Sequence, residues 1–323
     1  MGHLENGKWI TDQLPRTSAE GRFLRPASVF RNWITEQGSQ GPSGIGGYKA
    51  ESGRYHLYVS LACPWAHRTL ILRVLKRLEE HISVDIVHPD MLGDGWTFKS
   101  DGVAAKGDSL YDSEFLRDIY VRSEPRANGR ATVPVLWDRE TETIVSNESS
   151  EIIRMFNTAF NGITGDNLDL WPVENRGQIE EFNERIYRTV NNGVYKAGFA
   201  TSQAAYEEAA NGLFDSFDWL ERTLSNSRYL VNDELTEADW RLFTTLVRFD
   251  KVYATHFKCN RSRLVDYPNL WAYARELYQV PGVSETVNFH HIVRHYYFSH
   301  ANLNPTRIIP IGPVADWNEF HGR

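Results

Sequence analysis

The sequence contains very little cysteine: only Cys63 and Cys259 occur among its 323 residues. Two cysteines build no disulfide framework, and their spacing matches no zinc motif. A bridge between the two stays open, but a reducing compartment is favoured. The sequence also lacks any run of about 18 apolar residues, which excludes a membrane-spanning helix. Because residues 1–8 contain no apolar signal core either, we expect a cytoplasmic protein.

The sequence also lacks an excess of positive charge, with 35 Lys and Arg against 42 Asp and Glu. The net charge of −7 gives no electrostatic reason to expect a nucleic acid or an anionic membrane as partner. Aromatic residues are abundant instead, with 10 Trp, 15 Tyr and 16 Phe. Most of them should lie in the core, but such a chain can also line a flat pocket for an aromatic ligand. A chain of this length is expected to form two globular domains.

The residues around Cys63 predict a strand, a tight turn and a helix. Residues 55–60 are mostly aromatic or β-branched, and apolar residues recur at helical spacing after Trp65. Pro64 suits the first turn of that helix. Cys63 would then lie at the helix N-terminus, where unpaired N–H groups and the helix dipole stabilise a thiolate. A buried cysteine beside a helix cap is the alternative, and we favour the reactive thiolate.

The first half of the chain has the pattern of an α/β domain. Residues 1–54 look irregular, and residues 55–159 follow as a compact module. The predicted elements of this module are strands at 55–60, 82–87, 132–138 and 143–145, and helices at 65–80, at 109–122 and from 146–149 onward. Pro134 marks the start or the edge of its strand, because proline cannot donate to a ladder.

The second half of the chain is expected to be entirely helical. Residues 160–172, rich in Gly, Asn and Asp, are predicted to link it to the first half. Residues 173–323 then form an all-helical domain, with helices predicted at 174–197, 202–224, 236–256, 268–279 and 283–296. Thr236 and Asp239 have the spacing of a capping box. The tail from Ser299 contains three prolines and is expected to be irregular but docked.

This layout resembles the thioredoxin fold joined to a helical domain, as in the cytosolic glutathione transferases. Five sequence words are similar to those of the glutathionyl-hydroquinone reductases, the Xi class of that family: CPWAHR at 63–68, GWTF at 95–98, TVPVLWD at 132–138, SNES at 146–149 and NNGVYKAGFA at 191–200. The resemblance covers nearly the whole chain, as far as residues 309–313. It implies a thioredoxin-like glutathione-binding domain, an all-α C-terminal domain and a homodimer.

The resemblance also implies a glutathione site. Trp96 and Arg130 match glutathione contacts of the family, although alone they would be a packing residue and a surface charge. Val133, before a cis proline, would pair its backbone with the tripeptide. Glu148 would take the γ-glutamyl ammonium group, and Ser149 would bind the γ-glutamyl carboxylate at a helix N-terminus.

The catalytic residues implied by the resemblance are a cysteine and three tyrosines. Position 66 is alanine, so no Cys-x-x-Cys dithiol can form and a second glutathione must resolve any mixed disulfide at Cys63. By resemblance, Cys63 attacks the sulfur of an S-glutathionyl-hydroquinone and Tyr195 protonates the ring carbon. Tyr253 and Tyr296 match tyrosines that hydrogen-bond the thiolate. For each tyrosine the alternative is a core residue with a satisfied hydroxyl.

Three functions are therefore weighed. The first is glutathione-dependent reduction of S-glutathionyl-hydroquinones to hydroquinones, with glutathione as co-substrate and no metal. The second is a general thiol transferase or dehydroascorbate reductase that uses the same cysteine, and the third is a non-catalytic glutathione-binding protein. A metal site is not expected, because the histidines of the C-terminal region match no metal motif: His290, His291, His295 and His300.

Overall fold

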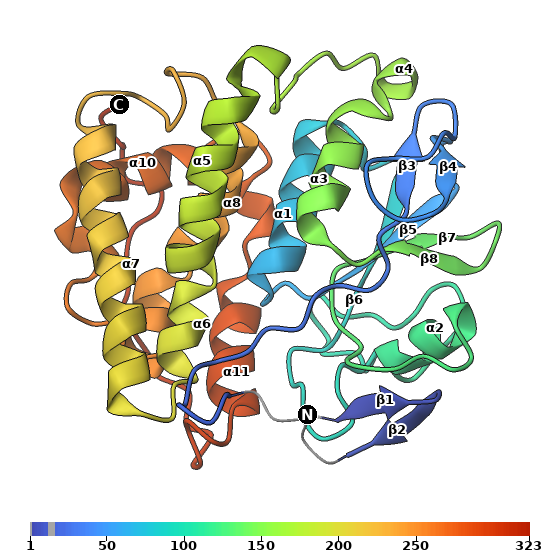
Figure 1. Cartoon of the computed structure of the whole chain (residues 1–323), viewed down its shortest axis with the longest axis horizontal. Helices are drawn as coiled ribbons and strands as arrows, with labels where there is room; N and C mark the ends of the chain where they lie inside the picture. Colours follow the sequence, from blue (N-terminus) through green and yellow to red (C-terminus); the bar gives the residue numbers. More distant parts are fainter. Residues whose placement is uncertain (1, 12–16) are drawn as a thin grey trace. The chain divides into compact units, whose positions relative to one another are not determined.

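The computed structural model describes residues 2–11 and 17–323, which divide into two compact units (Figure 1). The first unit contains the described residues within 1–14, together with 27–168 and 286–299. The second contains 17–26, 169–285 and 300–323. The chain passes between the units at residues 168 and 169, within the segment predicted as a linker. The structure groups residues 286–299 with the first unit, although the sequence pattern placed them in the helical domain.

The first unit is built on a four-stranded sheet in the order β6-β5-β7-β8. These strands are β5 (Tyr55–Val59), β6 (Ile82–Ile86), β7 (Val135–Asp138) and β8 (Thr143–Ser146). β5 pairs parallel with β6 and antiparallel with β7, and β7 pairs antiparallel with β8. Every residue of β5 and β7 is buried, because these two strands lie in the middle of the sheet. The four predicted strands and their mixed order, which define the thioredoxin-like fold, are confirmed.

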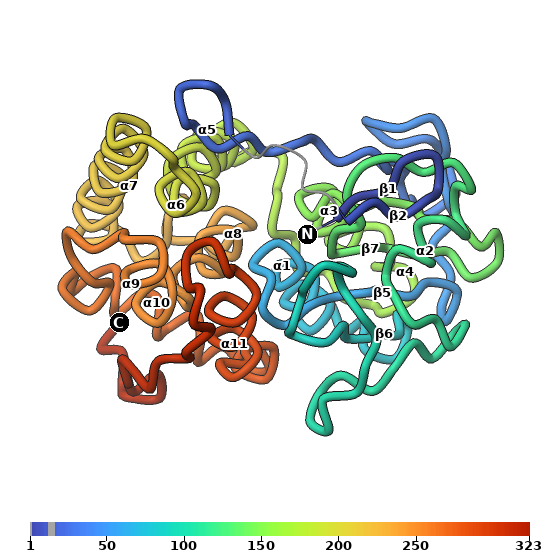
Figure 2. Tube along the Cα trace, turned by 90° about the horizontal axis from the view of Figure 1, so that it is seen from below, coloured from blue at the N-terminus to red at the C-terminus, as the bar shows by residue number. Residues whose placement is uncertain are grey.

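Three helices flank this sheet. α1 (Pro64–Leu75) and α3 (Ser149–Thr158) pack against each other on one side, and α2 (Leu116–Ser123) lies on the other (Figures 1 and 2). A short helix, α4 (Asn161–Thr164), follows α3. The predicted helix at 109–122 was wrong in its first half. The Asp108 carboxylate accepts the N–H groups of Leu110 and Ser113, which holds this stretch in turns until Leu116.

The prediction that residues 1–54 are irregular was also wrong in part. β1 (His3–Glu5) and β2 (Lys8–Ile10) form an antiparallel hairpin, and β3 (Trp33–Thr35) pairs parallel with β4 (Gly47–Lys49). Asn6 and Gly7 turn the hairpin with φ angles of 47° and 77°. Asn-Gly is the preferred pair for a two-residue hairpin turn, but strands of three residues carry too little alternation to be recognised.

The second unit is helical. Its α-helices are α5 (Arg176–Ile186), α6 (Gly193–Gly198), α7 (Gln203–Leu224), α8 (Glu237–Leu246), α9 (Ala254–His256) and α10 (Pro268–Tyr278). Among the described residues there are three single 3₁₀ turns: η1 (Val173–Asn175), η4 (Leu264–Asp266) and η5 (Ser284–Thr286). α11 (Phe289–Ser299) belongs to the first unit. In Figure 2, α5, α6 and α7 are seen nearly end-on.

Two of the predicted helices are interrupted by π-helical turns. η2 (Tyr187–Asn191) separates α5 from α6, and η3 (Phe249–Tyr253) separates α8 from α9. Each π turn inserts an extra residue, so the helix continues with its apolar face rotated. Because the apolar spacing is still close to helical, the sequence pattern gave one uninterrupted helix at 174–197 and another at 236–256.

The capping box of α8 is confirmed and is fully buried. Asp239 Oδ2 accepts the backbone N–H (2.8 Å) and the hydroxyl (3.0 Å) of Thr236. Asp239 Oδ1 accepts the Tyr273 hydroxyl (2.8 Å) and the Leu230 N–H (3.1 Å). Asp239 is 0% exposed, so this one carboxylate satisfies four donors away from water.

Substituting this carboxylate should therefore weaken the second unit. Asp239→Ala removes the acceptor of all four buried donors, so we expect the free energy of unfolding to fall by about 3 kcal/mol or more. Urea denaturation followed by circular dichroism measures the loss. Glu181→Ala, at an exposed position of α5, is the control and should change stability by less than about 0.5 kcal/mol. Equal losses in both variants would contradict the role given to Asp239.

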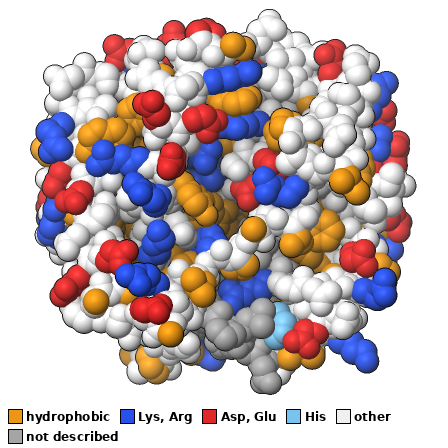
Figure 3. Space-filling model, viewed as in Figure 1, with side chains coloured by type: hydrophobic (Ala, Val, Ile, Leu, Met, Phe, Trp, Pro, Cys, Tyr) orange, Lys and Arg blue, Asp and Glu red, His pale blue; other side chains and the backbone are white. Residues whose placement is uncertain are grey.

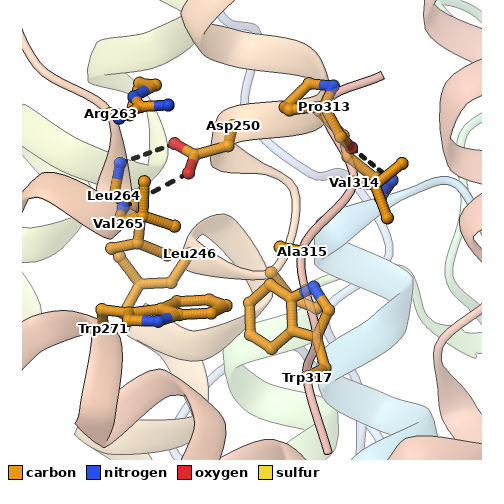
Figure 4. A pocket seen from close by; sticks show the side chains of 12 residues that line it. Leu246, Asp250, Arg263, Leu264, Val265, Trp271, Pro313, Val314, Ala315 and Trp317 are labelled. Carbon is orange, nitrogen blue, oxygen red and sulfur yellow. Dashed lines mark hydrogen bonds between the residues drawn. The ribbon is translucent and has the colours of Figure 1, made fainter. Parts of the chain in front are cut away.

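The C-terminal tail is irregular and lies against the helices of the second unit. Trp317 packs edge-on against Trp271, with ring centroids 4.8 Å apart, and the Trp317 carbonyl accepts a hydrogen bond from Gln279 (2.9 Å). A small pocket lies beside these two rings, and the Asp250 carboxylate at its rim accepts backbone N–H groups of η4 (Figure 4). The side chains that line it include none of the predicted site residues.

The surface carries charges of both signs. On the face drawn in Figure 3, acidic and basic side chains are interspersed. Within residues 2–11 and 17–323, no helix is long and apolar enough to cross a membrane.

Candidate active site

Cys63 is the N-cap residue of α1. Its backbone is extended (φ −78°, ψ 121°), Pro64 occupies the first helical turn, and the Cys63 carbonyl accepts the first helical hydrogen bond from the His67 N–H (3.0 Å). The thiol is half-buried, and neither Cys63 nor Cys259, both of which the structure describes, forms a disulfide. The predicted strand, turn and helix around Cys63 are thus confirmed. The first turn of α1 contains no acidic residue to oppose a thiolate.

Val133 lies next to Cys63 in the first unit. The Cys63 Sγ is 3.7 Å from the Val133 carbonyl oxygen, and the Val133–Pro134 peptide bond is cis, as the resemblance implied. Val133 lies two residues before the start of β7, the strand beside β5. The backbone that would pair with the cysteinyl part of glutathione therefore lies within reach of the thiol.

Glu148 is the N-cap residue of α3, so the helix begins at Ser149, the last residue of the 146–149 segment in which its start was expected. Its carboxylate accepts the N–H (3.1 Å) and the hydroxyl (2.7 Å) of Ser150, and the Ser28 hydroxyl (2.9 Å). Burial acts to raise the pKa of Glu148, but these hydrogen bonds and the charge of Arg68 outweigh it and lower the pKa. Glu148 is therefore an anion at neutral pH, as an ammonium partner would require.

Arg68 connects the N-termini of α1 and α3. Its guanidinium lies 4.6 Å above the Trp65 ring, and its Nη1 donates to the Ser149 hydroxyl (3.4 Å). Arg68 is 1% exposed and Ser149 is 3% exposed. Sequence reasoning included Arg68 in a family word but gave it no role. The available sequence signal for a role of Arg68 was its charge at an otherwise apolar position of the α1 pattern.

The N-terminal segment from Ser28 to Asn32 runs beside β8 and the residues that follow it. The backbone of Asn32 donates to Val145 (3.0 Å), and that of Asn147 donates to Phe30 (3.0 Å). This pairing brings Ser28 to the Glu148 carboxylate. No sequence pattern predicts this contact, because Ser28 lies in a segment without periodicity and its partner is 120 positions away.

Trp96 and Arg130 lie in two different loops of the first unit. Trp96 is 6% exposed, and its indole stacks on the His295 ring with centroids 4.7 Å apart and planes 22° apart. Arg130 is half-buried and follows Gly129, whose backbone forms two hydrogen bonds with Leu4 of β1 (2.7 and 2.9 Å). The Trp96 side chain and the backbone next to Arg130 are thus held by elements distant in sequence.

Tyr195 and Tyr253 lie close together in the second unit. Their ring centroids are 6.1 Å apart, and Tyr195 also packs edge-on against Phe257 (5.4 Å). Tyr253 ends the π turn η3 and is 0% exposed. Tyr195 lies in α6, four residues after η2. π turns occur often at functional sites, which agrees with the position of these two tyrosines.

Arg25 and the two asparagines before α6 hold the surroundings of Tyr195. Arg25 places its guanidinium 4.7 Å from the Tyr195 ring centroid and donates from Nε to the Asn192 side chain (2.7 Å). The preceding Asn191 donates to the Arg241 carbonyl (2.9 Å) and the Thr245 hydroxyl (2.8 Å) of α8. The two asparagines of the NNGVYKAGFA word therefore fix the start of α6, and sequence reasoning had not assigned them a role.

Tyr296 belongs to the first unit, together with Cys63. It lies on α11, is 1% exposed, and packs at a steep angle against the ring of the preceding His295 (5.4 Å, 76°). The predicted site residues therefore divide between the units. Tyr195 and Tyr253 lie in the second, and the first holds all the others: Cys63, Trp96, Arg130, Val133, Glu148, Ser149 and Tyr296.

The remaining candidates differ from Cys63 in their surroundings. Cys259 is 0% exposed, and burial raises the pKa of its thiol well above the ordinary value, which makes it a poor nucleophile. In the part of the chain that the structure describes, no group of three or more His, Cys, Asp or Glu side chains is placed to hold a metal ion. His291 instead pairs with Asp101.

Comparisons with known proteins agree with this arrangement. Residues 62–159 match the family model "Glutathione S-transferase, N-terminal domain", and residues 203–276 match "Glutathione S-transferase, C-terminal domain". The glutathionyl-hydroquinone reductase YqjG of Escherichia coli is 57% identical over 100% of this chain and 98% of its own length. The glutathionyl-hydroquinone reductase PcpF of Sphingobium chlorophenolicum is 47% identical over 97% of each chain.

Solved structures extend the likeness to three dimensions. The glutathione-bound structure of Escherichia coli YqjG matches with a TM-score of 0.93 at 55% identity, covering 100% of this chain and 99% of that one. The Xi glutathione transferase of Phanerochaete chrysosporium matches with a TM-score of 0.88 at 52% identity, covering 92% and 95%. The chain therefore belongs to the glutathionyl-hydroquinone reductases, the Xi class of the glutathione transferases.

Proposed function

We propose that this protein reduces S-glutathionyl-hydroquinones to free hydroquinones, consuming one glutathione and releasing glutathione disulfide. The observation that carries the proposal is the half-buried Cys63 at the N-cap of α1, with no second cysteine in its motif, in a chain 57% identical to a named glutathionyl-hydroquinone reductase. A single thiol of this kind supports exchange at sulfur through a mixed disulfide.

In the first half of the cycle, Cys63 attacks the sulfur of the substrate thioether. The Cys63 thiolate supplies the electron pair of the new S–S bond, and the pair of the broken C–S bond goes to the ring carbon. The ring carbon then takes a proton and the hydroquinone leaves. Tyr195 is the proposed donor of that proton, because a phenol can act as a general acid toward a developing carbanion. Tyr253 and Tyr296 are proposed to hydrogen-bond the thiolate.

In the second half, the thiolate of another glutathione attacks the glutathionyl sulfur of the mixed disulfide. Glutathione disulfide leaves and the Cys63 thiolate is restored, so two glutathionyl groups are oxidised for each ring carbon reduced. Position 66 is alanine, so the motif offers no neighbouring thiol that would compete with this external glutathione.

Glutathione is proposed to lie along the edge formed by Val133 and the N-terminus of α3. Val133 pairs with the cysteinyl backbone, and Ser149 receives the γ-glutamyl carboxylate at a helix start. Glu148 takes the ammonium group, while Trp96 and Arg130 contact the remainder of the tripeptide. The proximity of Cys63 Sγ to the Val133 carbonyl supports this placement, because it brings the cysteinyl part of glutathione close to the Cys63 thiol.

Glu148→Gln should weaken glutathione binding by about 10- to 100-fold, since it removes a charge-assisted contact to the ammonium group. The pKa of Glu148 is lowered in the folded protein, so its carboxylate stays ionised as pH falls. Its contribution to affinity should be constant between pH 5.5 and 7.5 and be lost only below the ordinary carboxyl pKa of about 4.3. Isothermal titration calorimetry measures both effects. The exposed Glu181→Ala serves as control, and equal affinity of Glu148→Gln and wild type would contradict the assignment.

The function itself is tested by comparing two kinds of substrate. A glutathionyl-menadiol conjugate and a glutathione mixed disulfide of a small thiol are each supplied with glutathione, and product is measured by chromatography. Efficient turnover of the conjugate supports the reductase. Turnover of the disulfide alone would point to a general thiol transferase, and binding of glutathione without turnover to a non-catalytic protein.

We also propose a cytoplasmic homodimer. The dimer rests on the family resemblance, and the cytoplasm on the need to keep Cys63 reduced. Sedimentation equilibrium at several concentrations tests the assembly, and a mass of one chain at all of them would overturn it.

A further inference from the structure

The loop between β6 and α2, residues 88–115, carries Trp96 and is held by α11. α11 lies about 200 residues further along the chain, yet it belongs to the same unit. The side chains that reach the loop share one face of α11, at helical spacings of three and four: His291, Arg294, His295 and Ser299.

The central contact is made by His295. Its Nδ1 donates to the Pro89 carbonyl (2.8 Å), which fixes the plane of the ring. The flat face of that ring stacks on the Trp96 indole, with centroids 4.7 Å apart. Ser299, one turn later, accepts the Met91 N–H (3.0 Å) and so fixes the start of the loop.

Two contacts to carboxylates of the loop strengthen the same attachment. Arg294 donates from Nε and Nη2 to the two oxygens of the Asp90 carboxylate (2.7 and 2.6 Å). His291 pairs with Asp101, whose carboxylate also accepts three backbone N–H groups of the loop, at residues 103–105. Burial acts to raise the pKa of Asp101, but these bonds lower it to about 2, so this anchor stays ionised at all ordinary pH values.

We propose that His295 is a positioning residue, which holds the Trp96 indole in place for glutathione by stacking on it. The proposal rests on the function above, in which Trp96 contacts glutathione. The residue after His295 is Tyr296, so one helix sets the position of a binding residue and a candidate catalytic residue together. Neither composition nor the family words single out His295.

The test compares two substitutions that separate the hydrogen bond from the stacking. Asparagine can replace Nδ1 as a donor to Pro89 but has no ring, whereas phenylalanine keeps a ring and loses the donor. We expect His295→Asn to shift and broaden the indole N–H resonance of Trp96, assigned by Trp96→Phe, and to weaken glutathione binding about 10-fold. His295→Phe should restore most of the affinity. His290→Asn, exposed on the same helix, should change neither.

The outcomes separate this proposal from the assignment of Trp96. Unchanged indole resonance and affinity in His295→Asn, or equal losses in the asparagine and phenylalanine variants, would overturn the role of His295. If Trp96→Phe binds glutathione as the wild type does, the Trp96 assignment is wrong and the proposal fails with it. If His295→Asn does not fold, Ser299→Ala loosens the same loop more gently, and an unchanged Trp96 resonance in that variant would overturn the proposal.

Discussion

Cys63→Ala should abolish reduction of glutathionyl-hydroquinones, lowering kcat/KM by about 1,000-fold or more, because no other group can form the mixed disulfide. Glutathione affinity should change by less than about 3-fold, since the proposed contacts of the tripeptide come from Val133, Glu148 and other residues. The two measurements together, turnover of the menadiol conjugate and calorimetric binding of glutathione, separate a lost nucleophile from a damaged site.

The mixed disulfide between Cys63 and glutathione gives a second test of the role of Cys63. Wild-type protein treated with the conjugate in the absence of free glutathione should gain one glutathionyl group, located on Cys63 by peptide mass spectrometry. Cys259→Ala is the matched control, because that thiol is fully buried and its pKa is raised. The control should be labelled and turn over like the wild type. Full turnover by Cys63→Ala would overturn the whole mechanism.

The parts of the fold that sequence predicted well are those with local signals. The strand, Cys63, Pro64 and the following apolar spacing form a continuous pattern, and α1 begins where that pattern places it. The Thr236–Asp239 capping box is similarly local, since both partners lie within one helical turn. Each signal indicates both the element and the residue at which it begins, so little tertiary information is needed for the start. The ends were predicted less well, since α1 ends at Leu75 and not at residue 80.

The parts that sequence missed depend on contacts between distant segments. Ser28 reaches Glu148 from 120 positions away, and His295 reaches Pro89 from 206 positions away. Neither a hydroxyl in an irregular segment nor a histidine on a helix belongs to a sequence pattern that would predict such a partner. The π turns at 187–191 and 249–253 were missed for a different reason, because one extra residue hardly alters an apolar pattern.

Apart from Cys63, the residues of the site were available from sequence only through family words. Local physical chemistry identified Cys63, whereas Trp96, Arg130 and the three tyrosines were assigned by resemblance. The structure shows why: Tyr253 and Tyr296 are at most 1% exposed, and nothing local distinguishes them from other core tyrosines. What distinguishes Tyr195 is its setting, with Arg25 beside its ring and a buried asparagine pair fixing its helix.

Tyr195→Phe should slow reduction of the glutathionyl-hydroquinone by about 100- to 10,000-fold, the usual range for loss of a general acid. A glutathione mixed disulfide, by contrast, should be reduced at nearly the wild-type rate. Its leaving group is a thiolate, which departs without a proton, whereas the ring carbon must be protonated as the C–S bond breaks. Stopped-flow measurement of single turnovers on both substrates gives the two rates separately.

Tyr206→Phe is the control for removing a phenol from the second unit, since the Tyr206 hydroxyl donates to the Lys258 carbonyl (2.7 Å) and has no proposed catalytic part. It should leave both rates unchanged. If Tyr195→Phe slows the disulfide as much as the conjugate, Tyr195 acts on the shared thiolate step and is not the ring acid. Because the Cys63 chemistry is common to both substrates, the ratio of the two losses isolates the step that only the carbon–sulfur substrate requires.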